Sequence, residues 1–83
     1  MGSNGLVNLA QMNSGQNGIV VEIQGGFGMT DRLNALGIIT GKKISKISSM
    51  VGRGPVTIEL DRVQIAIGFN MAKRILVEMD PKQ

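Results

Sequence analysis

Short apolar runs separated by glycine constrain the fold of this chain more than any other feature of its sequence. Five of them are five to seven residues long and carry β-branched residues, and a shorter one precedes them. They cover Leu6–Leu9, Ile19–Ile23, Ile44–Met50, Pro55–Leu60, Val63–Ile67 and Ile75–Met79. Strands of this length, with turn residues roughly every 8–12 positions, are typical of a small β-barrel or sandwich.

Alternation between apolar and polar residues predicts which side chains face the core of such a barrel. Ile19, Val21 and Ile23 are assigned in this way to one buried face, and Val56, Ile58 and Leu60 share one face of the strand that carries them. Val63, Ile65 and Ile67 are the alternating apolar residues of the strand that follows. Ile44 and Ile47 break the alternation, which indicates a bulge or a sharp bend in that strand. Asp61-Arg62 forms a two-residue connection and predicts a tight hairpin, although neither residue is glycine.

The segment Gly25–Gly41 interrupts the strands with a helical pattern. Thr30 is the predicted N-cap, because its hydroxyl can accept a hydrogen bond from the first turn, and the helix is expected over Asp31–Leu36. Leu33 and Leu36 then lie on one side of this helix and are assigned to the core. A helix this short needs tertiary support, so we expect it to cover something else. A second helical turn is expected near Gly68–Lys73.

Glycine and proline mark the turns that this arrangement requires. Gly37 follows the helix where a left-handed backbone ends it without a Cβ penalty. The full set assigned to turns and caps is Gly25, Gly26, Thr30, Gly37, Gly41, Gly54 and Pro55. Two glycine-rich stretches approach nucleotide-binding motifs but lack a required residue. Asp31 replaces the third glycine of the dinucleotide fingerprint, and Lys43 stands where a phosphate-binding loop needs Ser or Thr.

The 83 residues are enough for one domain, which we place at residues 6–79, between a lead-in at 1–5 and a tail at 80–83. Histidine and cysteine are absent, so the usual nucleophile–base pairs and transition-metal ligands are missing. No catalytic residue, metal site or cofactor is therefore predicted. The absence of an apolar run long enough to span a membrane and of a signal peptide predicts a cytoplasmic protein.

The most specific pattern in the chain is Arg32-Leu33-x-x-Leu36-Gly37-Ile38-x-x-Gly41, in register with Ala72-x-x-Ile75-x-Val77. Together with Gly25-Gly26, Gly54-Pro55 and Ile65-Ala66-Ile67-Gly68, it resembles the FeoA domain from Leu6 to about Met79. The resemblance implies an SH3-like barrel of five to six strands, whereas pattern alone separates that fold poorly from an OB-fold. Ala35 and Thr40 depart from the family, which often has Glu and Pro there. The partner surface is expected to differ accordingly.

The resemblance to FeoA domains also implies a function. These domains are small cytoplasmic components of ferrous iron transport, associated with FeoB, a membrane protein with a cytosolic GTPase portion. The chain is thereby expected to act without catalysis, as an accessory or regulatory module that binds the cytosolic part of FeoB. No membrane insertion is expected, and self-association is left open. The domain type also resembles the C-terminal module of metal-dependent repressors of the diphtheria-toxin-repressor family, but this chain carries no helix-turn-helix segment.

Two sets of residues are candidates for binding. Phe27, Met29 and Arg32 lie in or beside the helix and are the candidates for contact with the protein partner, since these residue types are enriched at interfaces. The alternatives are burial of Phe27 and Met29 over the mouth of the barrel and local packing or pairing of Arg32 on the surface. An alternative is a nucleic-acid stripe made by Lys42, Lys43, Lys46, Arg53, Arg62, Lys73 and Arg74. The net charge of only +3 and the lack of interleaved aromatic residues favour an ordinary solvated face for that set.

Overall fold

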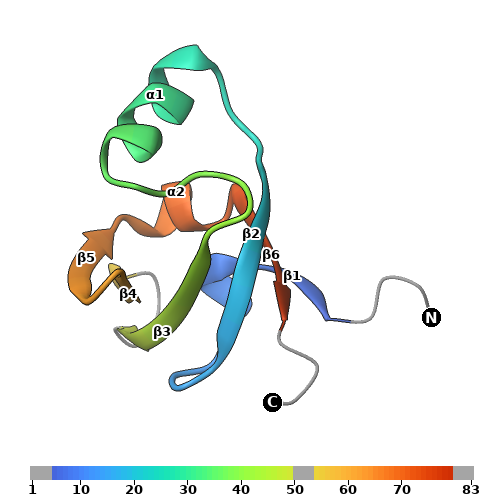
Figure 1. The fold of residues 1–83 in the computed structure, drawn as a ribbon, viewed down its shortest axis with the longest axis vertical. Coiled ribbons are helices and arrows are strands. Elements are labelled where there is room, and N and C mark those ends of the chain that lie inside the picture. Colours follow the sequence, from blue (N-terminus) through green and yellow to red (C-terminus); the bar gives the residue numbers. More distant parts are fainter. Residues whose placement is uncertain (1–4, 50–53, 80–83) are drawn as a thin grey trace.

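The computed structural model describes residues 5–49 and 54–79, and six strands and two α-helices lie within them (Figure 1). In chain order the elements are β1 (Leu6–Asn8), the 3-10 turn η1 (Leu9–Gln11), β2 (Asn17–Ile23), α1 (Phe27–Ala35), β3 (Lys43–Ser49), β4 (Val56–Leu60), β5 (Val63–Ile67), α2 (Phe69–Ala72) and β6 (Ile75–Met79). The helical turn expected near Gly68–Lys73 is confirmed as α2. The tail, most of the lead-in, Met50, and the Gly52-Arg53 half of one predicted turn lie outside the described residues.

The six strands form one antiparallel sheet in the order β1-β6-β2-β3-β4-β5. The register between β3 and β4 shifts between Lys46 and Ser48, which confirms the bend that Ile44 and Ile47 predict. A second shift lies between Val20 and Glu22, where β2 pairs with β6. Bulges of this kind bend strands and increase their twist, and the sheet curves accordingly in Figure 1.

Aliphatic side chains from nearly every element fill the inside of this curved sheet. The buried apolar residues are Leu9, Met12, Val20, Leu33, Ile38, Ile44, Val56, Ile58, Leu60, Ile67, Ala72, Ile75 and Val77. Val56, Ile58 and Leu60 lie among them, as their alternation predicts. A core with no aromatic residue depends on close packing of branched side chains, since each aliphatic contributes only about 1.5–3 kcal/mol on burial.

The interior face assigned to β2 is wrong at Ile19 and Val21 and right at Ile23, which packs against the core. Val20 is the buried residue, whereas Ile19 is 44% exposed and Val21 is 40% exposed. Ile19, Val20 and Val21 are all apolar, so both faces of the strand carry apolar residues here and alternation cannot show which face is buried. The bulge at Val21 then lets Val20 and Ile23 both pair with inward-facing residues of β6, Val77 and Ile75, although the two are three positions apart.

The hairpin between β4 and β5 is as tight as predicted, and the first residue after its turn is exposed. Asp61 and Arg62 form the two-residue turn with φ of 53° and 68°, the left-handed conformation that such hairpins require. Val63 directly follows and is 56% exposed, because β5 is an edge strand and its first residue lies at the rim of the core. Ile67, at the other end of β5, is buried.

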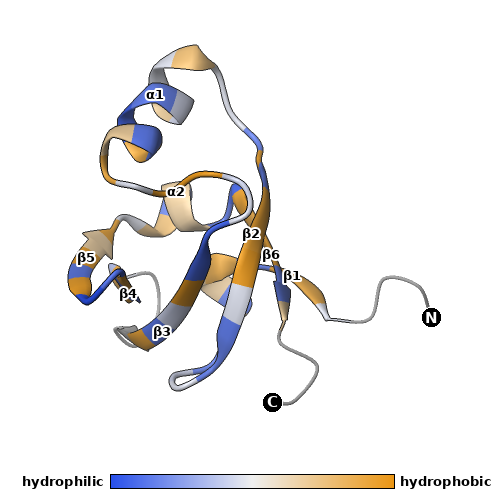
Figure 2. Ribbon diagram, viewed as in Figure 1, coloured by the Kyte–Doolittle hydropathy of each residue, from blue (hydrophilic) through white to orange (hydrophobic). Residues whose placement is uncertain are grey.

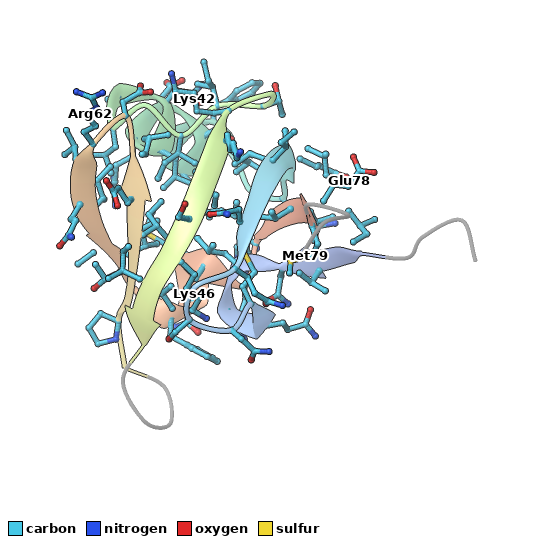
Figure 3. The ribbon with its side chains drawn as sticks, turned by 60° about the horizontal axis from the view of Figure 1, so that its bottom comes forward. Lys42, Lys46, Arg62, Glu78 and Met79 are labelled. Atoms are coloured by element: carbon cyan, nitrogen blue, oxygen red, sulfur yellow. The ribbon has the colours of Figure 1, made fainter. Side chains whose placement is uncertain are left out.

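Lys46 is the one buried charged residue among the described residues, and its burial contradicts its assignment to a solvated basic face. It is 1% exposed, and Nζ donates hydrogen bonds to the carbonyl oxygens of Leu9 at 3.1 Å, Ala10 at 3.1 Å and Met12 at 2.5 Å. Burial lowers the pKa of the Lys46 ammonium. The side chain thus reaches from β3 across the core to the 3-10 turn after β1, where it satisfies carbonyls that no strand can pair (Figure 3).

Candidate partner-docking site

The connection from β2 to β3 contains α1 and forms one end of the molecule (Figure 1). α1 begins at Phe27, four residues before the expected start. Gly26 is its N-cap, with an extended backbone and no side-chain cap, and the Thr30 N–H already bonds the Gly26 oxygen at 3.0 Å. The assignment of Thr30 as N-cap is therefore wrong. Glycine at 26 and 28 disguises this first turn, because glycine is a poor helix former in isolation.

The end of α1 matches the expectation from the sequence. Gly37 has φ of +95°, its N–H bonds the Asn34 oxygen at 2.9 Å, and the Ile38 N–H bonds the Leu33 oxygen at 3.0 Å. This is a Schellman motif, in which the residue after the left-handed glycine packs against the last turn. Leu33 and Ile38 are both fully buried and supply that contact. The Gly37 turn lies close to Leu60 at the end of β4. A Cβ on residue 37 would come within 3.1 Å of the Leu60 side chain.

The two ends of α1 present apolar residues to solvent. Phe27, its first residue, is 90% exposed, and Leu36, its C-cap, which the helical spacing assigned to the core, is 46% exposed. Leu36 is the C-cap, and the buried contacts at this end of α1 are made by Leu33 and Ile38 instead. Figure 2 shows hydrophobic colour at the start of α1 and again in the loop that follows it, where Ile39 is also exposed.

The three residues predicted to bind a partner do not share one face of α1. Met29 is half-buried and packs against the core. At roughly 100° per residue, Phe27 lies about 160° around the helix from Met29 and about 140° from Arg32. Phe27 and Arg32 are both exposed, so they can reach one partner only if it wraps around the helix or covers its end. Contact of these three residues with a protein partner remains a prediction.

The β4–β5 hairpin extends this surface with a second cation. Leu60, which contacts the Gly37 turn, is the ladder partner of the exposed Val63. The Lys42 ammonium lies 2.7 Å from the Asp61 carboxylate, so its charge is partly neutralised. Arg62 is exposed and makes no ion pair within residues 5–49 and 54–79 (Figure 3). We define the α1 surface as Phe27, Arg32, Leu36, Ile39, Arg62 and Val63.

Three further features bear on what the described residues can bind. Across residues 5–49 and 54–79 no three carboxylates come close enough to hold a metal ion. No helix in the same residues has the length and apolar character to cross a membrane. Of the seven basic residues considered for nucleic acid, Lys46 is buried, Lys42 pairs with Asp61, and Lys73 lies 5.5 Å from the Phe69 ring centroid.

These features define a small, mainly β module of SH3-like fold with one exposed helical connection. The chain belongs to the FeoA domain family, since the FeoA domain matches residues 7–79. A protein of Methanocaldococcus jannaschii with the name "Putative Fe(2+) transport protein A" is 39% identical over 70 residues, which are 84% of this chain and 83% of the relative. The predicted family and fold are both confirmed.

Solved structures agree with this assignment. The crystal structure of an iron uptake regulatory protein, FeoA, superposes with a TM-score of 0.82 at 36% identity, over 90% of this chain and 97% of that one. A manganese-dependent transcriptional repressor reaches a TM-score of 0.83 at 18% identity, over 90% of this chain but 42% of the repressor. At 18% identity the similarity concerns the fold alone. The sequence predicts such a similarity to a module of metal-dependent repressors.

Proposed function

We propose that this chain is a non-catalytic accessory module of ferrous iron transport, and that it binds the cytosolic portion of a FeoB-type transporter through the α1 surface. Its family supports the role in iron transport. One observation carries the choice of surface: Phe27 is 90% exposed at the start of α1, with Leu36 and Val63 exposed farther along the same end of the molecule. Several exposed apolar residues in one region are typical of a protein interaction site.

The chemistry of the α1 surface specifies the kind of partner. Phe27 supplies an aromatic side chain that can enter an apolar pocket, and such residues dominate the binding energy of many interfaces. Arg32 and Arg62 are both exposed and can each form a bidentate pair with a carboxylate. The partner is therefore expected to offer an apolar pocket and acidic groups, and the interaction to occur in the cytoplasm.

A titration of the purified chain against the cytosolic portion of the transporter tests this function. Wild type is expected to bind, and Phe27→Ser and Arg32→Glu are each expected to weaken binding about tenfold or more. Ile47→Ser is the matched control. Ile47 is an exposed aliphatic residue four positions along β3 from its start, about 13 Å from the α1 end. The control should bind as wild type does.

Two outcomes would contradict the proposal in different ways. If wild type fails to bind the cytosolic portion in every nucleotide state, the accessory role at FeoB is wrong. If wild type binds and both Phe27→Ser and Arg32→Glu bind equally well with unchanged urea midpoints, the partner is right and the surface is wrong.

A further inference from the structure

A second exposed apolar surface lies on the outside of the sheet, away from α1. Its exposed apolar members are Leu6 of β1 and Ile19 and Val21 of β2, and the half-buried Leu76 of β6 lies beside them, opposite the exposed Glu22. Leu6, Ile19 and Val21 are each at least 40% exposed, and Figure 2 shows one continuous hydrophobic stretch in β2. We call this set the outer sheet face. The FeoB proposal does not use it.

Charges on either side of Ile19 distinguish the outer sheet face from scattered surface residues. Ile19 pairs with Glu78 of β6 on one side and with Lys43 of β3 on the other. Directly opposed residues in a ladder point to the same side of the sheet, and both charged residues are exposed. Ile19 therefore lies at the centre of a row that runs Leu6, Glu78, Ile19, Lys43 across four strands.

This row is complementary to itself. A two-fold axis parallel to β2 and passing over Ile19 places Ile19 against Ile19 of a second copy. Because β6 and β3 each lie one strand spacing of about 4.8 Å from β2, the same operation places Glu78 opposite Lys43 of the second copy, and does so twice. The curvature of the sheet carries β6 and β3 away from the axis, and the long side chains of Glu78 and Lys43 suit that wider gap.

We propose that the outer sheet face binds a second copy of this chain in a symmetric dimer, with Ile19 at its centre and two reciprocal Lys43–Glu78 ion pairs beside it. The row spans four strands, roughly 15 Å, which is a narrow contact. A standard interface buries ~800 Å² on each partner. The dimer is accordingly weak and forms at micromolar concentrations or above.

Sedimentation equilibrium from micromolar to millimolar protein tests the dimer with two charge reversals. Lys43→Glu gives a protomer with two acidic residues beside Ile19, and Glu78→Lys gives one with two basic residues. Each variant alone is expected to dimerise at least ~10-fold more weakly than wild type, because like charges then face each other. An equimolar mixture of the two restores both opposite-charge pairs between unlike protomers. It should associate at least ~10-fold more tightly than either variant alone.

The mixture separates contacts between copies from contacts within one chain, because no contact within a chain is changed by mixing. Ile19→Thr, which keeps a β-branched residue in β2, is expected to weaken association while leaving the urea midpoint close to that of wild type. A wild type that stays monomeric at millimolar concentration would overturn the proposal. So would single variants that associate as wild type does, or a mixture no tighter than its components.

Discussion

Replacement of the buried Lys46 by methionine tests how the core of this domain is held together. Methionine keeps the unbranched apolar stem and removes the ammonium, which donates to the carbonyl oxygens of Leu9, Ala10 and Met12. The bonds to Leu9 and Met12 are buried, but the Leu9 oxygen keeps a hydrogen bond from the Met12 N–H at 3.3 Å. The Met12 oxygen loses its donor, and a buried acceptor without a donor costs about 1–3 kcal/mol. Relief of the desolvated charge returns part of this.

The expected net loss for Lys46→Met is about 1–2 kcal/mol in the free energy of unfolding. The total is roughly 4–12 kcal/mol, at ~0.05–0.15 kcal/mol per residue, so this loss is measurable. With a urea m-value of about 1 kcal/mol per molar, the midpoint should fall by about 1–2 M. Lys43→Met, at an exposed lysine on the same strand, is the control and should change it by less than ~0.5 kcal/mol. A Lys46→Met midpoint equal to that of wild type would refute the reasoning.

Four further outcomes are expected. Because burial lowers the pKa of Lys46 below its ordinary 10.5, the unfolded chain binds more protons in the window just below pH 10.5. The urea stability of wild type relative to Lys46→Met should therefore rise with pH through that window, and a flat difference would contradict the shift. Gly37→Val should lose about 2 kcal/mol or more, from φ of +95° and the approach of Leu60, and a wild-type melting temperature would argue against it. Arg62→Gly should gain about 1 kcal/mol, because glycine suits φ of 68°, and a loss in thermal stability would show that Arg62 stabilises the turn. Calorimetry with Fe²⁺ should show no stoichiometric site of micromolar affinity on the isolated chain, since histidine and cysteine are absent, and such a site would disprove this.

The sequence predicts most reliably those positions where the backbone conformation demands a particular residue. Gly37 is recognisable because a left-handed residue that ends a helix is usually glycine, and the structure has it there. The Asp61-Arg62 hairpin is recognisable from the spacing of the strands beside it, although Arg62 is an unusual residue for its conformation. Gly37 therefore predicts the end of α1, and the Asp61-Arg62 turn with the alternation in β4 predicts the β4–β5 hairpin.

Tertiary contacts decide the features that the sequence leaves open. Ile19, Val20 and Val21 are equally apolar, and only pairing with β6 selects Val20 for the core. The Lys46 ammonium binds carbonyls 34 to 37 residues earlier in the chain, which no local pattern reveals. In the candidate site, the exposure of Phe27 follows from the early start of α1, hidden from sequence analysis by its flanking glycines.

Backbone amide chemical shifts of the ¹⁵N-labelled chain, recorded during titration with the cytosolic portion of a FeoB-type transporter, test the proposed docking surface most directly. Perturbed amides are expected to cluster in residues 25–42 and at Arg62 and Val63, with those of β1 and β6 unchanged. Perturbations confined to the outer sheet face, or none at saturating transporter concentration, would contradict it.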